Sequence, residues 1–136
     1  MINIVLADDH QAVRKGLRTL LSTEPGFNVV GEAANGREAV SIVNRQKPDV
    51  LVLDLMMPDV SGLEVTRRLS KKCPRTSIVI LSMQSDKAYV QEALRCGARG
   101  YVLKESPPEE ILHAIHSVSR RDYYLSPALS KIELVL

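Results

Sequence analysis

Five short runs of apolar residues, rich in β-branched side chains, recur along the chain and alternate with segments of helical spacing. The runs span residues 2–7, 27–33, 50–53, 77–81 and 100–103. They are continuous instead of alternating apolar with polar residues, which is typical of strands covered on both faces in a parallel sheet. Between and after the runs, apolar residues recur every three or four positions, most clearly at Val13, Leu17, Leu20, Leu21 and later at Ile111, Ala114, Ile115, Val118.

The regular change between the two spacings predicts an α/β fold with a single doubly wound parallel sheet of five strands and five helices. We expect the flavodoxin-like strand order 2-1-3-4-5. Asn35 and Ser106 each stand three residues before a glutamate, so both are predicted to cap helices. After Arg121 the pattern breaks. Residues 1–121 are therefore expected to form the domain, and residues 122–136 a linker or C-terminal extension.

The composition is that of a soluble globular protein, with 45% apolar and 25% charged residues, and the 136 residues have room for one domain. A net charge of +2 is too small to indicate a nucleic-acid surface. No apolar stretch approaches the roughly 20 residues of a membrane span, and the N-terminus lacks a secretion signal, so a cytoplasmic protein without membrane contact is expected. Cys73 and Cys96 form no metal-binding pattern and are predicted to be reduced and without function.

Polar residues stand at the ends of four predicted strands. Asp8 and Asp9 follow the first strand, Asp54 ends the third, Ser82 the fourth and Lys104 the fifth. The carboxyl ends of parallel strands lie at one edge of the sheet, so these side chains are expected to converge. Three carboxylates repel one another unless a cation intervenes. Oxygen ligands without cysteine or histidine favour a hard cation, and a few carboxylates plus waters favour Mg²⁺ over Ca²⁺.

The same pocket is predicted to carry out phosphoryl transfer. Asp54, at the tip of a central strand, can attack phosphorus directly and form an acyl phosphate, and an ionised carboxylate needs no general base. Lys104 supplies a positive charge for one phosphoryl oxygen, and the Ser82 hydroxyl can donate to another. Together with a metal ion, these groups supply the positioning and charge neutralisation that phosphoryl transfer requires.

At these residues the sequence resembles the receiver domain family of bacterial response regulators, over roughly residues 1–121. Every landmark of the family occurs in order: Asp8-Asp9, Leu53 to Pro58, Gly62, Leu81-Ser82 and Gly97 to Lys104. The resemblance implies that Asp9 and Asp54 bind Mg²⁺ through their carboxylates, Met56 through its backbone carbonyl and Asp8 largely through a bound water. It further implies a signalling switch and not a conventional enzyme, with a sensor histidine kinase as phosphodonor and slow self-catalysed hydrolysis.

The resemblance also names a switch pair, Ser82 and Tyr101. The hydroxyl would move to the new phosphoryl oxygen and the ring would turn inward, which changes the surface of the fourth helix, fifth strand and fifth helix. The side chains of Met56 and Gln84 are expected to tune hydrolysis. Lys104 is followed by Glu105 where many receivers have proline, so a cis peptide bond is not expected here.

The segments Gly100 to Lys104 and Tyr123 to Pro127 look most like the NarL/FixJ subfamily, in which a LuxR-type helix-turn-helix domain follows a linker. We therefore expect the chain to be the receiver part of a longer transcription regulator, which would contact DNA only through the helix-turn-helix domain absent from this sequence. The resemblance also implies a homodimer that forms on phosphorylation.

Two other functional classes share parts of this pattern. A haloacid-dehalogenase-type phosphatase also uses a strand-end aspartate, but it needs an acid two residues later, where this chain has Met56. A flavodoxin-like cofactor module would place a phosphate at the first loop, where Asp8 and Asp9 would repel it. The histidines His10, His113 and His116 are interpreted as surface or helix-boundary residues.

Overall fold

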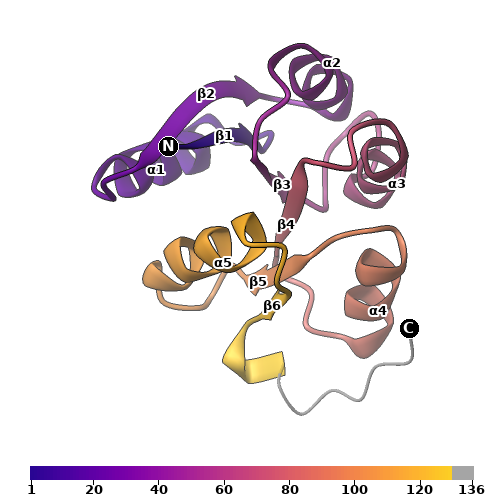
Figure 1. Ribbon diagram of the computed structural model, residues 1–136. Coiled ribbons are helices and arrows are strands. Elements are labelled where there is room, and N and C mark those ends of the chain that lie inside the picture. Colours follow the sequence, from indigo (N-terminus) through magenta and orange to yellow (C-terminus); the bar gives the residue numbers. More distant parts are fainter. Residues whose placement is uncertain (130–136) are drawn as a thin grey trace.

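The computed structural model describes residues 1–129, which form one parallel sheet between two layers of helices (Figure 1). The strands are β1 (Ile2–Ala7), β2 (Phe27–Ala33), β3 (Val50–Asp54), β4 (Ser77–Ser82), β5 (Gly100–Leu103) and β6 (Tyr124–Leu125). The helices are α1 (Gln11–Ser22), α2 (Gly36–Gln46), α3 (Gly62–Lys72), α4 (Lys87–Arg95), α5 (Glu109–Ser119) and the 3-10 turn η1 (Pro127–Leu129). Within these residues, no helix has the length and apolar character needed to span a membrane.

The predicted strand order is confirmed: the sheet runs β2-β1-β3-β4-β5-β6, with every neighbouring pair parallel. The sixth strand was not predicted. Tyr124 and Leu125 pair with Gly100 and Tyr101 of β5, so the segment expected to be a linker begins as part of the sheet. The physical reason is that β5 would otherwise be an edge strand with unpaired backbone groups, and a short following segment closes that edge.

Each face of the sheet carries its own hydrophobic core. Figure 1 shows α1 and α5 on one face and α2, α3 and α4 on the other. Because side chains alternate along a strand, successive residues of one run enter different cores. Ile4 and Leu6 lie in the core under α1 and α5, whereas Val5 and Ala7 lie in the other. This explains why the apolar runs are continuous.

Helix starts follow the sequence signals in one case and depart from them in another. The Asn35 side chain accepts a hydrogen bond from the Glu38 backbone N–H (2.9 Å), as predicted for a cap of α2. The prediction for Ser106 is wrong, because α5 begins at Glu109 and its first turn is closed by the backbone carbonyl of Pro107, which accepts from Glu110. The Ser106 hydroxyl instead lies 3.3 Å from that of Ser126. No cis peptide bond occurs in residues 1–129.

Candidate functional site

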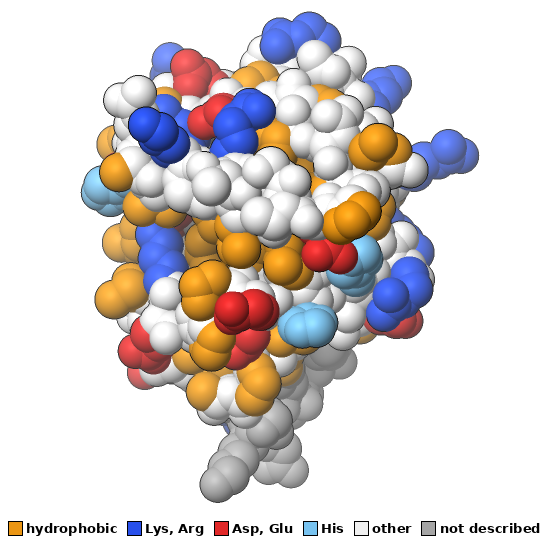
Figure 2. Space-filling model, turned by 90° about the vertical axis from the view of Figure 1, so that its left-hand side faces the viewer, with side chains coloured by type: hydrophobic (Ala, Val, Ile, Leu, Met, Phe, Trp, Pro, Cys, Tyr) orange, Lys and Arg blue, Asp and Glu red, His pale blue; other side chains and the backbone are white. Residues whose placement is uncertain are grey.

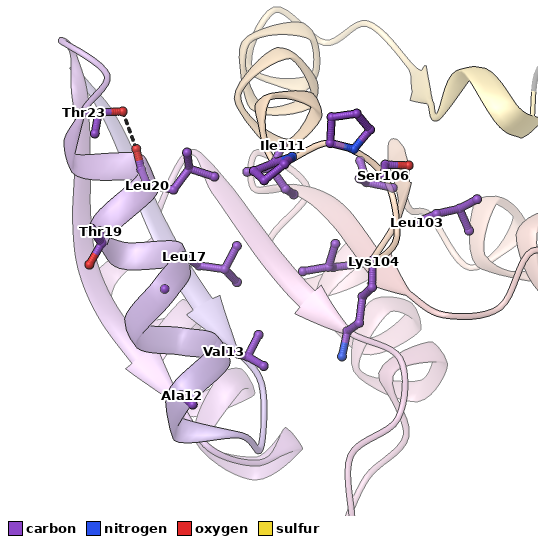
Figure 3. A pocket seen from close by; sticks show the side chains of 15 residues that line it. Ala12, Val13, Leu17, Thr19, Leu20, Thr23, Leu103, Lys104, Ser106 and Ile111 are labelled. Atoms are coloured by element: carbon purple, nitrogen blue, oxygen red, sulfur yellow. Dashed lines mark hydrogen bonds between the residues drawn. The ribbon is translucent and has the colours of Figure 1, made fainter.

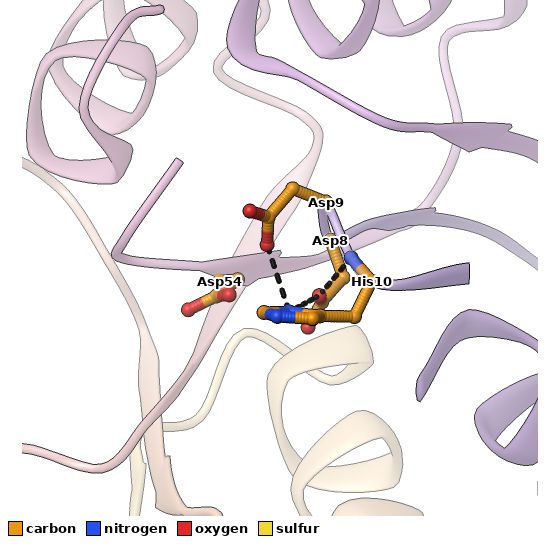
Figure 4. A group of neighbouring side chains, drawn as sticks. All are labelled: Asp8, Asp9, His10 and Asp54. Atoms are coloured by element: carbon orange, nitrogen blue, oxygen red, sulfur yellow. Dashed lines mark hydrogen bonds and ion pairs between the residues drawn. The ribbon is translucent and has the colours of Figure 1, made fainter. Parts of the chain in front are cut away.

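Carboxylates from two strands meet at the carboxyl edge of the sheet. Asp54 is the last residue of β3, and Asp8 directly follows the neighbouring strand β1. Both side chains are buried, with relative exposures of 4% for Asp54 and 1% for Asp8. Asp8, Asp9, His10 and Asp54 each bring one ligand atom within 4.8 Å of the others (Figure 4). The structure thus brings together the three aspartates that the sequence singled out.

Lys104 extends into this cluster from the end of β5. Its Nζ lies 3.2 Å from Asp54 Oδ2 and 3.5 Å from Asp8 Oδ2. The other oxygen of Asp54, Oδ1, accepts a hydrogen bond from the Met56 backbone N–H (3.1 Å). The Asp54 carboxylate is therefore held at one oxygen by the chain that follows it and at the other by an ammonium group.

The environment of Asp54 disfavours its charge. Burial raises the pKa of Asp54 above its ordinary value, and the nearby Asp8 carboxylate acts in the same direction. The hydrogen bond from Met56 and the charge of Lys104 lower the pKa but do not offset the burial. An additional cation in the pocket would stabilise the ionised form of Asp54.

The donor set fits such a cation. Asp8 Oδ1 accepts a hydrogen bond from the His10 backbone N–H (2.9 Å). Among the described residues, the buried Oδ2 of Asp8 has no hydrogen-bond partner, and Lys104 Nζ lies 3.5 Å from it. A buried, charged oxygen without a hydrogen bond is costly. The carboxylates around it are the ligands that Mg²⁺ prefers.

His10 lies closer to this cluster than the sequence suggested. Its Nδ1 is 3.0 Å from Asp9 Oδ1 and 3.4 Å from Asp8 Oδ1, although the side chain as a whole is 67% exposed (Figure 4). The sequence signal for this proximity is that His10 directly follows the acidic pair Asp8-Asp9. Sequence alone indicates no more than a surface or helix-boundary histidine at this position.

Ser82 ends β4 and Tyr101 lies in β5, and both are tied to the loop between β4 and α4. Both residues are buried. Ser82 Oγ accepts from the Gln84 backbone N–H (3.0 Å), and the Tyr101 hydroxyl donates to the Gln84 carbonyl (2.7 Å). Burial raises the pKa of Tyr101, against a smaller opposing effect of its hydrogen bond with Ser82. The ring of Tyr101 thus lies in the interior of the domain.

Gly62, at the start of α3, holds the loop after Asp54 close to the helix. Its N–H donates to the Leu55 carbonyl (2.8 Å). A Cβ at this position would lie 2.6 Å from Leu55 Cα and 2.7 Å from the Asp54 carbonyl oxygen. Only glycine allows the loop after Asp54 to fold back this closely.

A separate apolar groove of about 670 Å³ lies between α1 and the start of α5. Figure 2 shows hydrophobic side chains gathered across this face, and Figure 3 shows Val13, Leu17 and Leu20 on the α1 wall. Of the apolar stripe predicted for α1, these three are half-buried and only Leu21 is fully buried. Lys104 lines the groove, yet its Nζ pairs with the carboxylates. The residues that line the groove are mostly apolar, whereas the acidic cluster gathers several ionisable side chains.

Comparisons with known proteins show which family this chain resembles. A family model described as a response regulator receiver domain matches residues 4–116. The chain is 38% identical to the transcriptional regulatory protein DegU of Brevibacillus brevis and 39% identical to the nitrate/nitrite response regulator protein NarL of Escherichia coli strain K12, each over 129 residues. A crystal structure of a LuxR-family two-component response regulator from Aurantimonas sp. SI85-9A1 superposes with a TM-score of 0.93 at 36% identity, covering 97% of this chain and 94% of that one.

The alignments cover nearly all of this chain but little more than half of each of the two regulators. Each includes 95% of this chain, but only 55% of DegU and 60% of NarL. The chain therefore spans between 55% and 60% of the length of these curated relatives.

Proposed function

Because this chain belongs to the family of response regulator receiver domains, and to its NarL and DegU type, we propose that Asp54 accepts a phosphoryl group from a phosphohistidine of a sensor kinase. The family consists of signalling switches and not of classical enzymes. One observation carries the proposal: the buried Asp54 carboxylate lies 3.2 Å from the Lys104 ammonium, beside the acidic pair at the carboxyl edge of the sheet.

In the proposed transfer, a carboxylate oxygen of Asp54 attacks phosphorus. The new O–P bond forms while the P–N bond to the donor imidazole breaks, and its electron pair returns to the imidazole nitrogen. Lys104 pairs with the phosphoryl oxygens as negative charge spreads over them. The Met56 N–H keeps the carboxylate oriented by holding Asp54 Oδ1.

Asp8, Asp9 and Asp54 are proposed to hold Mg²⁺, with Met56 contributing its backbone carbonyl. The buried Asp8 Oδ2 that lacks a hydrogen bond supports this assignment. When bound, the ion would neutralise the charge of the carboxylates and of the incoming phosphoryl group. The chain's own residues would position the reacting oxygen and exclude water from it.

Ser82 and Tyr101 are proposed to report the phosphorylation. Both hydrogen-bond to the backbone of Gln84, so a shift of the Ser82 hydroxyl toward a phosphoryl group on Asp54 would change the loop between β4 and α4. The exposed side chain of Met56 and the neighbouring Gln84 are proposed to tune hydrolysis of the acyl phosphate.

The output proposed for the whole protein is control of transcription. The matched relatives are described as a transcriptional regulatory protein and a nitrate/nitrite response regulator. We propose that residues 1–121 are the phosphoacceptor domain and that residues 122–136 are a linker or C-terminal extension toward a DNA-binding domain, of which Tyr124 to Leu129 pack on the receiver. We further propose that phosphorylation favours a homodimer. A cytoplasmic location follows from the proposed kinase and DNA partners.

The direct test is phosphorylation by acetyl phosphate with Mg²⁺, followed by mass spectrometry and peptide mapping. The wild-type chain should gain the mass of one phosphoryl group, located on the peptide that contains Asp54. Asp54→Asn should gain none, because an amide cannot form the acyl phosphate. Asp86→Asn, at an exposed aspartate before α4, is the matched control and should label like wild type. Equal labelling of Asp54→Asn would refute the acceptor assignment.

A further inference from the structure

The outer edge of β5 is closed by residues that follow α5. The Tyr124 N–H donates to the Arg99 carbonyl (2.9 Å), and the Ser126 N–H donates to the Tyr101 carbonyl (3.0 Å). The segment from Tyr124 to Leu129, here called the closing segment, therefore pairs with the strand that carries the proposed switch tyrosine and leads into Lys104.

Ser126 continues this pairing with its side chain. Ser126 is fully buried (0% exposed), and its Oγ accepts a hydrogen bond from the Leu103 backbone N–H (3.0 Å). The chain turns into η1 directly afterwards, so no further backbone carbonyl of β6 is available at this point. Without Ser126 Oγ, the Leu103 N–H would be buried without this acceptor, at a cost in free energy.

The closing segment is anchored at both ends. Leu129 is 1% exposed and belongs to the hydrophobic core on the face of α2, α3 and α4. The Tyr124 hydroxyl donates to Glu110 of α5 (3.2 Å), and burial, followed by the Glu110 charge, raises the pKa of Tyr124 to about 12. The segment is thus built into the domain and does not merely lie on its surface.

We propose that Ser126 is a positioning residue for Lys104. Leu103 immediately precedes Lys104, whose backbone N–H donates to the Ser82 carbonyl (2.8 Å) and whose Nζ reaches Asp54. The chain at Leu103 and Lys104 is therefore fixed from two sides, by β4 and by the closing segment. Ser126 sets the place from which the lysine side chain extends to the phosphoryl group.

The proposal rests on the proposed function and deepens it. If Ser126 fixes the backbone beneath Lys104, occupation of the acceptor site and the order of the closing segment must influence each other. Such coupling is reciprocal: whatever factor one site exerts on the other is returned. The closing segment would then respond to phosphorylation through its pairing with β5, and no other protein would have to bind at this edge of the sheet.

The test uses beryllofluoride with Mg²⁺, a phosphoryl analogue, titrated into the whole chain and followed by NMR. Ser126→Ala should bind it about three- to tenfold more weakly, the factor expected when one buried hydrogen bond no longer supports the site. Ser77→Ala is the matched control, because Ser77 is also buried and its Oγ donates to a backbone carbonyl, that of Val118 (2.9 Å). It should lower the free energy of unfolding but leave the affinity unchanged.

Ser106→Ala separates the two contacts of Ser126. It removes the neighbouring hydroxyl at 3.3 Å but leaves the Leu103 bond in place, so wild-type affinity is expected. An affinity loss as large as that of Ser126→Ala would overturn the assignment to the Leu103 bond. Wild-type affinity in Ser126→Ala, together with a lowered free energy of unfolding, would show a purely structural role and overturn the proposal.

Hydrogen exchange of the wild-type chain tests the role of Ser126 even if Ser126→Ala does not fold. Beryllofluoride should change the hydrogen exchange of the Leu103 and Ser126 amides, because Leu103 lies in β5 next to Lys104 and Ser126 lies in the closing segment that pairs with β5. Binding without any change at these amides contradicts the proposal. Failure of the wild-type chain to bind beryllofluoride at all contradicts the proposed function instead, so the two failures are distinguishable.

Discussion

Asp59 is an exposed residue whose hydrogen bonds connect two parts of the site's framework. Its Oδ1 accepts from the Gly36 N–H (2.8 Å) and its Oδ2 from the Arg37 N–H (3.1 Å), both at the start of α2. Partial desolvation raises the pKa of Asp59, but hydrogen bonds from Gly36, Val60, Arg37 and its own backbone outweigh it and lower the pKa to about 2. The loop after Asp54 is thereby tied to a helix N-terminus that favours negative charge.

The lowered pKa of Asp59 predicts the direction of a pH effect on stability. A carboxylate with a depressed pKa in the folded state contributes stability above its unfolded pKa and loses it as the pH falls. Asp59→Ala should therefore have a lower free energy of unfolding than wild type at neutral pH, and the difference should disappear between about pH 4 and about pH 2. Urea unfolding across this range measures it, with Asp86→Ala as control. A difference independent of pH would contradict the prediction.

At the level of single residues, the sequence predicted the site residues that stand at the ends of strands. Asp8, Asp54 and Lys104 meet because parallel strands end at one edge. Asp59 and Ser126 were missed, since their roles depend on hydrogen bonds to residues 22 or 23 positions away in the chain. No periodicity or spacing reveals such pairs.

Among the secondary-structure elements, α3 depends on the glycine at its first position. Gly62→Ala would force its Cβ against the backbone of Asp54 and Leu55, neither of which is a flexible side chain. The free energy of unfolding should fall by about 1–3 kcal/mol, and phosphorylation should slow because the loop after the acceptor must move. Thermal unfolding and labelling by acetyl phosphate measure the two effects.

Gly16 provides the matched control for this substitution. It lies inside α1, and a Cβ there would meet nothing within 4 Å. Gly16→Ala should therefore raise the free energy of unfolding by about 0.5–1 kcal/mol, because alanine favours a helix interior more than glycine does. Equal effects of the two substitutions would show that the close approach at Gly62 does not matter.

Element boundaries were predictable where a local signal and the sheet agree. The runs at residues 2–7, 27–33 and 100–103 coincide with β1, β2 and β5, and Asn35 caps α2 as expected. β6 could not be foreseen, because two residues carry no periodicity and form a strand only when β5 offers an unpaired edge. The apolar residues of α1 were correctly predicted to lie on a helix. Sequence alone did not show that Val13, Leu17 and Leu20 line an open groove.

In the molecule as a whole, three carboxylates from separate parts of the chain lie together at the carboxyl ends of β1 and β3. Asp8 and Asp9 follow β1, Asp54 ends β3, and the ammonium of Lys104, after β5, lies 3.2 Å from Asp54 Oδ2. Burial raises the pKa of Asp54, so its ionised form is disfavoured in the folded chain. A cation bound by these carboxylates would both remove this disadvantage and connect β1 to β3.

Mg²⁺ should therefore stabilise the entire fold. A ligand that binds only the folded state adds about 2.7 kcal/mol to the free energy of unfolding when its concentration is a hundred times its Kd. Thermal unfolding of the wild-type chain should shift upward with added Mg²⁺ relative to KCl of equal ionic strength, which controls for screening. Asp9→Ala should lose most of the shift because it removes one carboxylate, whereas Asp86→Asn should keep it. A full Mg²⁺ shift in Asp9→Ala, or none in wild type, would exclude these carboxylates as the metal site.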